Sequence, residues 1–324
     1  MTARTVAILE PGYSDYGTER SVLEPLGARV VAVPAERDAL SALSELNPTA
    51  VLIREREVTR EVMAACPDLK LIARYGVGVD NVDIQAASER RIFVANIPDY
   101  GAEHEVSDHA LALYLAVQRR VVSRDADVRR GLWGIGQAQQ IPDRSDATLG
   151  LIGFGRIGVR AAAKFRAFGF DRVIVVDPYV SAKKIAASAM EKVDLDTLCR
   201  SADVISLHAP CGPETYHMLG DAQFALMKPT TILINVSRGG LVDDAALARA
   251  LAEGRLFGAG IDVFEQEPPV ADNPILGAPN TVLSDHTAWY SERSVTALQS
   301  KAAREVARVL SGECPKNWVN RWTG

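Results

Sequence analysis

Short apolar runs alternate with segments of helical periodicity along most of the chain. Continuous apolar runs, without polar positions between them, are typical of strands buried on both faces of a parallel sheet. The first hundred residues therefore predict an α/β fold with helices covering both faces of such a sheet. The predicted strands are Val6–Leu9, Val30–Val33, Ala50–Ile53, Leu71–Ala73 and Ile92–Ala95, and the predicted helices are Glu19–Leu26, Ala39–Leu46, Arg60–Ala65 and Ile84–Arg90.

The pattern breaks around Pro98–Gly101, and a long helix is predicted to begin near Glu103. Its apolar positions, among them Ala110, Leu113 and Val117, recur at helical spacing and make a wide apolar face. We expect so wide a face to lie between two domains or two subunits. The alternation then resumes, with strands predicted at Leu149–Ile152, Val173–Val176, Val204–His208, Thr231–Val236, Phe257–Val263 and Thr281–Leu283, and helices from Asp243 to Ala252 and from Ser291 to Leu310.

Three glycines lie between a predicted strand and a predicted helix, in the stretch Gly153-Phe154-Gly155-Arg156-Ile157-Gly158. In a dinucleotide fingerprint the first glycine permits a tight turn, and the second lets the backbone approach a pyrophosphate. The third lets the helix pack close to the sheet. The helix N-terminus then faces the anion with free N–H groups and a favourable dipole. This stretch predicts a dinucleotide-binding site.

The next predicted strand ends on Asp177, about 20 residues beyond the glycines, as this fingerprint requires. A carboxylate there accepts hydrogen bonds from the adenosine ribose and repels a 2′-phosphate, which favours NAD over NADP. Lys183 and Lys184 follow closely and leave the strictness of that preference open.

Composition narrows the class of protein. The chain has 324 residues, more than one typical core, so we expect two domains with boundaries near Tyr100 and His286. A net charge of −5 argues against a nucleic-acid partner, and no apolar run approaches the roughly 20 residues of a membrane span. The chain enters a predicted strand almost at once, without a signal-peptide pattern. Scattered cysteines, with no metal-like spacing, predict reduced thiols and a cytoplasmic location; they are Cys66, Cys199, Cys211 and Cys314.

Charged side chains follow the ends of the later strands, where ligands of open α/β sheets bind. Arg238 precedes two glycines, so its fork of N–H groups could meet a carboxylate beside closely approaching backbone. Glu267 and His286 follow the next two strands. A glutamate near a histidine fixes the imidazole in one tautomer and favours its protonated form, which can deliver a proton. We predict no catalytic role for the other histidines. His104 and His109 lie on the polar flank of the long helix, His208 lies at a strand end and His217 lies in a loop.

Together these stretches resemble the D-isomer-specific 2-hydroxyacid dehydrogenases, over nearly the whole chain. The matching stretches are Ala73–Asp83, the glycine loop with Asp177, His208–Pro210 with Glu214–Thr215, Val236–Gly240, Asp262–Phe264 with Glu267–Pro268, and His286. The resemblance implies an NAD-dependent oxidoreductase that interconverts a 2-oxo acid and a D-2-hydroxy acid. It implies a Rossmann domain of residues 101–286 and a flavodoxin-like, discontinuous substrate-binding domain of residues 1–100 and 287–324.

The resemblance also implies roles for residues. Arg238 would hold the substrate carboxylate and polarise its carbonyl, His286 would donate the proton in reduction, and Glu267 would sustain that protonation. The substrate would also meet Arg74, Tyr75, Gly76, Val77, Gly78 and Trp289, with backbone N–H groups offered by the Gly76–Gly78 turn. NAD(H) would meet Gly153, Gly155, Arg156, Ile157, Gly158, Asp177, His208, Pro210, Thr215, Val236, Ser237 and Asp262. Arg54, Tyr75 and Tyr100 are candidate specificity residues, and no metal is implied.

Within the family, the segment from His286 to Glu292 resembles that of the C-terminal-binding-protein corepressors, whose tryptophan lines the substrate pocket. Trp289 could pack against a medium-sized apolar or thioether side chain, or instead anchor the last helix. Family members commonly form homodimers through the long-helix region. Two alternatives stay open: an NAD(H)-sensing dimeric interaction module with weak dehydrogenase activity, and a reductase of imine or phosphorus substrates.

Overall fold

The structure, a computed structural model, describes residues 4–9, 12–134 and 141–322. The chain forms two compact units: Met1–Gly101 with Ser291–Gly324, and Ala102–Tyr290. The second unit therefore runs beyond the predicted boundary at His286. The reason is local, because the backbone N–H groups of Thr287 and Ala288 each donate to the Asp262 carboxylate at 3.0 Å and keep this segment in the second unit.

The first unit is built on a parallel five-stranded sheet in the order β2-β1-β3-β4-β5. This is the flavodoxin-like order. The apolar runs form these strands because a parallel sheet is covered on both faces. The strands β1, β3 and β4 are almost wholly buried, and the edge strand β2 is half buried. The strands are β1 (Arg4–Leu9), β2 (Ala28–Val33), β3 (Ala50–Ile53), β4 (Leu71–Arg74) and β5 (Phe93–Ala95).

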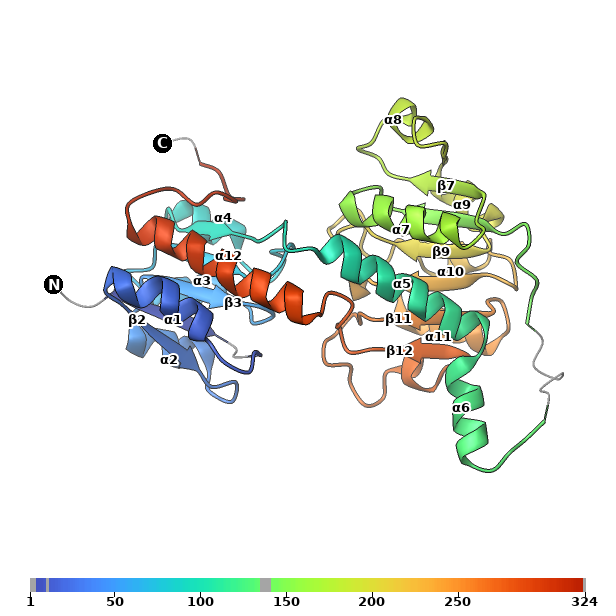
Figure 1. Cartoon of the computed structure of the whole chain (residues 1–324), viewed down its shortest axis with the longest axis horizontal. Helices are drawn as coiled ribbons and strands as arrows, with labels where there is room; N and C mark the ends of the chain where they lie inside the picture. The colour runs from blue at the N-terminus through green and yellow to red at the C-terminus, as the bar shows by residue number, and fades with distance from the viewer. Residues whose placement is uncertain (1–3, 10–11, 135–140, 323–324) are drawn as a thin grey trace. The chain divides into compact units, whose positions relative to one another are not determined.

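Helices cover both faces of this sheet. One face carries α12, which packs on α1 and β4, and the other carries α2, α3 and α4 (Figure 1). The predicted helix Glu19–Leu26 is α helix only to Leu23, because Pro25 lacks an N–H and the chain continues as one 3₁₀ turn, Glu24–Leu26. The helices are α1 (Gly17–Leu23), α2 (Ala39–Leu46), α3 (Arg60–Ala64), α4 (Ile84–Glu89) and α12 (Glu292–Leu310).

The second unit contains a parallel seven-stranded sheet in the order β12-β11-β10-β9-β6-β7-β8. Counted from its first strand, β6, the order reverses between β6 and β9, which is the topological switch point of a Rossmann fold. The strands are β6 (Thr148–Ile152), β7 (Arg172–Val176), β8 (Glu191–Lys192), β9 (Val204–Leu207), β10 (Ile232–Asn235), β11 (Gly258–Ile261) and β12 (Thr281–Leu283). The predicted fold class is confirmed.

Two layers of helices enclose this sheet, with α5 and α7 together on one face (Figure 1) and α9, α10 and α11 on the other. The helices are α5 (Ala102–Gln118), α6 (Val121–Arg129), α7 (Arg156–Ala167), α8 (Ala182–Ala186), α9 (Leu195–Ser201), α10 (Asp221–Phe224) and α11 (Asp244–Ala252), with 3₁₀ turns at Gly239–Leu241 and Pro274–Gly277.

The wide apolar face of α5 is buried within its own unit. Leu113 lies so close to β11 that a Cβ on Gly260 would stand 2.7 Å from the Leu113 Cβ. Val117 meets Gly258 in the same way, at 2.6 Å. Because Gly258 and Gly260 have no side chains, the helix can pack close to the sheet. The expectation that this face needs a second domain or subunit is therefore wrong.

A buried carboxyl in the first unit makes the stability of that unit depend on pH. Glu19 is fully buried and accepts hydrogen bonds from the Tyr75 hydroxyl (2.7 Å) and the Gln299 amide (3.2 Å). Burial raises the pKa of Glu19 above its ordinary 4.5, although the two hydrogen bonds oppose the shift. The folded state therefore holds this proton more tightly than the unfolded chain does.

The stabilisation from Glu19 is complete below pH 4.5, the ordinary value, and is lost as the pH rises through the folded-state pKa. We expect Glu19→Gln, whose single amide oxygen can still accept from the Tyr75 hydroxyl and which cannot ionise, to unfold with a free energy that declines less over this range. Urea denaturation of both proteins at a series of pH values measures the difference. Parallel pH profiles would show that Glu19 is not the group responsible.

Candidate active site

A tight turn joins β6 to α7. Gly153 has φ 96°, and a Cβ there would lie 2.5 Å from the carbonyl oxygen of His208. A Cβ on Gly158 would lie 2.3 Å from the Gly153 carbonyl oxygen, whereas one on Gly155 would meet nothing within 4 Å. Two of the glycines are thus required by the packing of the protein itself. Gly155 instead borders open space at the helix N-terminus, where the exposed Arg156 and half-buried Ile157 begin the first turn.

The first N–H groups of a helix have no partner inside that helix, and the helix dipole makes this end favourable for an anion. Open space at Gly155 and an N-terminus at Arg156 fit the pyrophosphate of a dinucleotide. The residues present at the switch point therefore fit the predicted cofactor.

Asp177 follows β7 at the edge of this crevice. One carboxylate oxygen accepts from the N–H of Phe154 at 2.8 Å, and the other accepts from Tyr179 at 2.9 Å and Val180 at 3.0 Å. Three backbone donors fix the position of the negative charge beside the glycine turn. An oxygen can accept more than one hydrogen bond, so the carboxylate can still meet ribose hydroxyls.

His208 follows β9 on the other side of the switch point. Its Nε2 lies 2.9 Å from the Ser206 hydroxyl, and within the described residues its buried Nδ1 has no hydrogen-bond partner. Burial lowers the pKa of His208 to about 4, so the ring is neutral near pH 7. In the turn that follows, the Thr215 hydroxyl accepts from the N–H of Gly212 and donates to the Pro210 carbonyl oxygen, both at 2.9 Å.

The turn that carries Arg238 is held by the last residue of β10. The Asn235 side chain accepts from the Ser237 N–H at 3.1 Å and donates to the Arg238 carbonyl oxygen at 2.9 Å. The Ser237 hydroxyl donates to the Leu207 carbonyl oxygen at 2.5 Å, and Val236 is buried. The sequence alone did not single out Asn235, although a buried asparagine at a strand end is a frequent turn former.

Gly239 brings the Arg238 turn against the loop that carries Glu267. A Cβ on Gly239 would lie 1.8 Å from the carbonyl carbon of Phe264, so only glycine permits this approach. The Phe264 N–H in turn donates to Glu267 Oε1 at 3.0 Å. Backbone packing therefore fixes Arg238 and Glu267 relative to each other.

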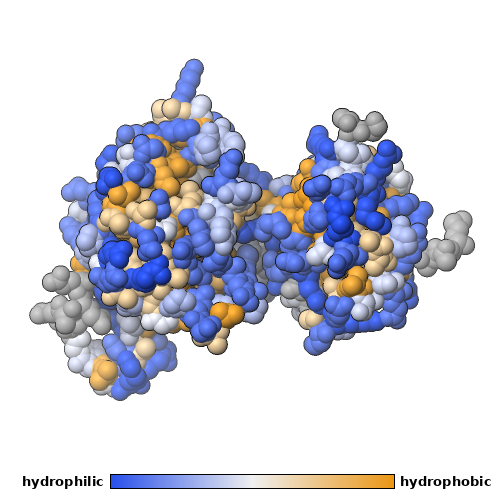
Figure 2. Space-filling model, turned by 180° about the vertical axis from the view of Figure 1, so that it is seen from behind, coloured by the Kyte–Doolittle hydropathy of each residue, from blue (hydrophilic) through white to orange (hydrophobic). Residues whose placement is uncertain are grey.

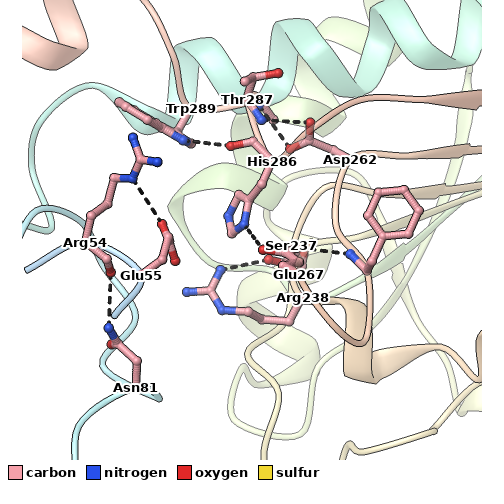
Figure 3. A network of polar contacts seen from close by, with 12 residues as sticks. Arg54, Glu55, Asn81, Ser237, Arg238, Asp262, Glu267, His286, Thr287 and Trp289 are labelled. Carbon is pink, nitrogen blue, oxygen red and sulfur yellow. Dashed lines mark hydrogen bonds and ion pairs between the residues drawn. The ribbon is translucent and has the colours of Figure 1, made fainter. Parts of the chain in front are cut away.

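Arg238, Glu267 and His286 gather beyond the strand ends of the second unit (Figure 3). His286 Nδ1 lies 2.6 Å from Glu267 Oε2. An ionised carboxylate only accepts, so Nδ1 carries a proton and Nε2 is the ring nitrogen left to exchange one with a ligand. The Arg238 guanidinium donates from Nη1 to the Ser237 carbonyl oxygen at 2.8 Å. The structure thus brings the three predicted catalytic residues together.

The backbone of His286 is held on both sides. Its φ of 55° lies in the left-handed region, which costs a residue with a side chain on the order of 1 kcal/mol. The His286 N–H donates to the Asp262 carbonyl oxygen at 2.7 Å, and the Trp289 indole N–H donates to the His286 carbonyl oxygen at 2.8 Å. The Trp289 side chain therefore helps to hold the backbone of His286, the candidate proton donor.

Asp262 is the anchor of this loop. Its side chain is only 1% exposed and accepts from the Ser284 hydroxyl at 2.6 Å and from the Thr287 and Ala288 N–H groups at 3.0 Å each. These contacts give Asp262 a positioning role, and its contact with the nicotinamide stays a prediction.

The interpretation of His109 as an ordinary residue of a polar helix flank is wrong. Its Nε2 lies 2.8 Å from the Ser284 hydroxyl, although the two residues are 175 positions apart. Local sequence patterns carry no signal for a contact of this range. A second cluster was also missed, in which His217 Nε2 lies 3.0 Å from Glu265 Oε1 and Tyr216 stacks on the His217 ring.

The predicted substrate residues of the first unit are partly engaged within that unit. Tyr75 is 3% exposed and donates to Glu19, and Arg74 is buried, donates to the Arg54 carbonyl oxygen and pairs with Glu55 at 3.3 Å. The Gly76 N–H donates to the Arg74 carbonyl oxygen at 2.9 Å. The Tyr75 hydroxyl and the Gly76 N–H are thus engaged inside the first unit. Substrate contacts of Arg74, Tyr75, Gly76, Val77 and Gly78 stay predictions.

Within the described residues, no group of three or more His, Cys, Asp or Glu side chains is placed to hold a metal ion. In the same part of the chain, no helix is long and apolar enough to cross a membrane. All of the cysteines lie in described segments and none forms a disulfide.

Comparison with known proteins places this site in a family. Residues 111–288 match the model of the D-isomer specific 2-hydroxyacid dehydrogenase, NAD binding domain. The chain is 38% identical over 302 residues to the D-3-phosphoglycerate dehydrogenase of Methanocaldococcus jannaschii, covering 92% of this chain and 56% of that protein. It is 37% identical over 293 residues to the glyoxylate reductase of Korarchaeum cryptofilum, covering 90% of this chain and 87% of that one. The chain thus spans little more than half of the first relative.

A solved structure agrees over the full length. The D-lactate dehydrogenase from Aquifex aeolicus, complexed with NAD and lactic acid, superposes with a TM-score of 0.87 at 27% identity, covering 98% of this chain and 100% of that one. By the matched domain, the extent of identity and the shared architecture, the chain belongs to the D-isomer specific 2-hydroxyacid dehydrogenase family.

Proposed function

We propose that the chain is an NAD-dependent oxidoreductase that interconverts a 2-oxo acid and a D-2-hydroxy acid. The observation that carries this proposal is the pairing of His286 Nδ1 with Glu267 at 2.6 Å, beside Arg238 and in the same unit as the dinucleotide crevice. A fixed, proton-bearing imidazole next to a guanidinium suits a carbonyl oxygen that becomes a hydroxyl. Membership of the family supports the same reaction.

In the reductive direction, bound NADH supplies a hydride to C2 of the 2-oxo acid. The residues of the chain do the rest. Arg238 has N–H groups in a fork that suits a carboxylate and a neighbouring carbonyl oxygen, and it stabilises the negative charge that grows on that oxygen. His286 donates from Nε2 to the oxygen, while Glu267 holds Nδ1–H and stabilises the ring as it changes charge. In the oxidative direction the same nitrogen accepts the proton.

The cofactor is NAD(H), held at the glycine turn. The fixed carboxylate of Asp177 supports a preference for NAD over NADP, because its three backbone donors keep it from swinging away from a 2′-phosphate. His208, Pro210, Thr215, Val236, Ser237 and Asp262 border the same strand ends and are proposed to line the cofactor site.

Asp177→Asn removes the charge and keeps one oxygen, which can still accept from the N–H groups of Tyr179 and Val180 but not also from that of Phe154. We expect the ratio of kcat/KM with NADH to kcat/KM with NADPH to fall by about tenfold or more, since one lost charge contact is worth over 1 kcal/mol in a partly buried site. Steady-state kinetics with both cofactors measures the ratio. Asp171→Asn, an exposed residue just before β7, is the control and should leave the ratio unchanged. A wild-type protein that already prefers NADPH would refute this role of Asp177.

The first unit, Met1–Gly101 with Ser291–Gly324, is proposed as the substrate-binding domain, with Arg74, Val77 and Gly78 toward the substrate carboxylate. Trp289 is proposed to limit the substrate side chain. The resemblance of its segment to the corepressors stays a prediction. A sensing module needs no proton donor, so the trio Arg238, Glu267 and His286 favours the enzyme over the NAD(H) sensor.

A homodimer is proposed, with α6 and the residues after it at its interface. Val121, Val122 and Val128 are each more than half exposed, and Trp133 is 92% exposed. Figure 2 shows apolar atoms at the surface where α6 projects from its unit. So much exposed apolar surface on one short arm is typical of an interaction site. A cytoplasmic location is also proposed, since the cysteines of the chain form no disulfide.

The reaction is tested by following NADH absorbance with purified protein and a panel of 2-oxo acids. The panel contains glyoxylate, hydroxypyruvate, 3-phosphohydroxypyruvate, pyruvate and 4-methylthio-2-oxobutyrate, each with and without methylamine. Turnover without the amine supports a 2-oxo acid reductase. Turnover only with the amine supports an imine reductase instead, and NADH binding without any turnover supports a sensor.

A further inference from the structure

His109, on a helix, contacts the residues that hold the segment carrying His286. His109 lies on α5, and its Nε2 is 2.8 Å from the Ser284 hydroxyl and 3.5 Å from Asp262 Oδ1. Its side chain is 27% exposed, whereas that of Asp262 is 1% exposed. Nothing in the proposed reaction uses His109 directly. Its position therefore calls for another role.

Counting protons fixes the direction of these hydrogen bonds. The Ser284 hydroxyl has one proton and lies 2.6 Å from a carboxylate oxygen of Asp262, which as an anion can only accept. Ser284 therefore donates to Asp262, and its oxygen accepts from His109. It follows that His109 Nε2 carries a proton, whether the ring is neutral or charged. The chain of donors runs from His109 through Ser284 to Asp262.

The Asp262 carboxylate depends on such donors because it is buried. It accepts from the Ser284 hydroxyl and from the N–H groups of Thr287 and Ala288. Among the described residues, His109 is the one Lys, Arg or His side chain with a nitrogen within 4 Å of this carboxylate. A buried carboxylate that loses a donor must find another partner or move, since leaving it unsatisfied is costly.

Movement of Asp262 would reach His286 directly. Asp262 holds the two N–H groups that follow His286 with its side chain and the His286 N–H with its carbonyl oxygen at 2.7 Å. Together these contacts keep His286 at its unfavourable φ of 55°. A side chain that fixes Asp262 thus fixes the backbone of the proton donor.

We propose that His109 is a positioning residue for the proton-transfer step: its Nε2–H orients Ser284, which locks Asp262 and thereby sets the direction of the His286 ring. The proposal rests on the proposed function, because it assigns the role of His109 through the proton donor. It predicts that the side chain at position 109 must donate a hydrogen bond to the Ser284 hydroxyl oxygen.

Three substitutions of His109 distinguish the effect of its hydrogen-bond donor from the effects of side-chain volume and charge. His109→Gln keeps an N–H at the position of Nε2, His109→Leu keeps apolar bulk without a donor, and His109→Glu offers only acceptors and adds a negative charge near Asp262. We expect kcat within about threefold of wild type for Gln. We expect a loss of about 10²-fold for Leu, as for a misplaced reacting group, and a larger loss for Glu. The dissociation constant of NADH, followed by protein fluorescence, should change far less than kcat does in His109→Leu and His109→Glu.

His104→Leu is the matched control, since it lies on the same helix with an exposed side chain, and its kcat should be that of wild type. A readout independent of activity comes from amide hydrogen exchange followed by mass spectrometry. In His109→Leu we expect exchange to speed up in the peptide that spans residues 284–290, and to stay unchanged in the strands β6 and β9. His109→Gln should exchange as wild type does.

A wild-type kcat and wild-type exchange in His109→Leu would overturn the proposal. So would equal losses in Gln and Leu together with faster exchange throughout the second unit, because that result describes a general loss of stability. If the wild-type protein reduces no 2-oxo acid, the proposed function fails and the role in proton transfer fails with it. The exchange data then still decide whether His109 holds the loop.

Discussion

Replacing His286 by alanine should lower kcat for reduction of the 2-oxo acid by about 10²- to 10⁴-fold, the usual contribution of a positioned general acid. The loss follows from the geometry, because Glu267 holds Nδ1 at 2.6 Å and leaves Nε2 as the nitrogen that delivers the proton. NADH should bind almost as before, since the glycine turn is built from β6 and α7. Single-turnover absorbance and fluorescence titration measure the two quantities separately.

His217→Ala is the matched control for this substitution. His217 also contacts a glutamate, Glu265 at 3.0 Å, but it lies outside the trio. Its loss should change kcat far less than the loss of His286 does. An His286→Ala protein that retains kcat near wild type would show that another group donates the proton.

Replacing Arg238 by methionine should produce the second large effect. The guanidinium is the group proposed to hold the substrate carboxylate and to stabilise the growing charge on the carbonyl oxygen. Loss of one such donor typically lowers kcat by about 10²- to 10³-fold. Because the substrate carboxylate also loses its partner, KM for the 2-oxo acid should rise as well, which separates Arg238 from a purely chemical group. Initial rates over a range of substrate concentrations give both values.

Arg238→Lys tests the importance of the fork, because lysine keeps the charge and loses the paired N–H groups. We expect it to recover only part of the activity. Arg249→Met is the control for a lost arginine in the same unit, since Arg249 pairs with Asp221 at 2.7 Å on the exposed surface of α11. If Arg238→Met raised neither KM nor the barrier, the carboxylate would have to bind elsewhere.

Much of the fold could be predicted from the sequence because buried parallel strands leave a direct signal. The strand Ala50–Ile53 and the helix Ala39–Leu46 occur in the structure with the predicted bounds. Four apolar residues in a row need cover on both faces, and that requirement specifies the layers as well as the strand. The structure contains the predicted glycine turn for a similar reason, since Gly153 has no space for a side chain.

Features that depend on distant packing were not predictable in this way. The apolar face of α5 meets β11 only because Gly258 and Gly260 leave room for it, and nothing in the helix itself identifies its partner. The strand β8 has only two residues, too few to carry a periodic signal.

The same difference between local patterns and distant packing applies to the residues of the site. Arg238, Glu267 and His286 could be predicted because each follows a strand of one sheet, so topology brings them to one edge. The contact between His109 and Ser284 joins a helix to a loop across 175 positions, and no local pattern encodes it. The contact of the Tyr75 hydroxyl with Glu19, 56 positions away on α1, was not predictable for the same reason.

The most direct test of the account is the configuration of the product. Purified protein, NADH and hydroxypyruvate are incubated to completion, and the hydroxy acid is resolved by chiral chromatography. We predict one D-2-hydroxy acid formed for each NADH consumed, and a rate of NADH loss lower by about 10²- to 10⁴-fold with His286→Ala. An L or racemic product, or NADH that binds but is never consumed with any 2-oxo acid, would contradict the proposed reaction.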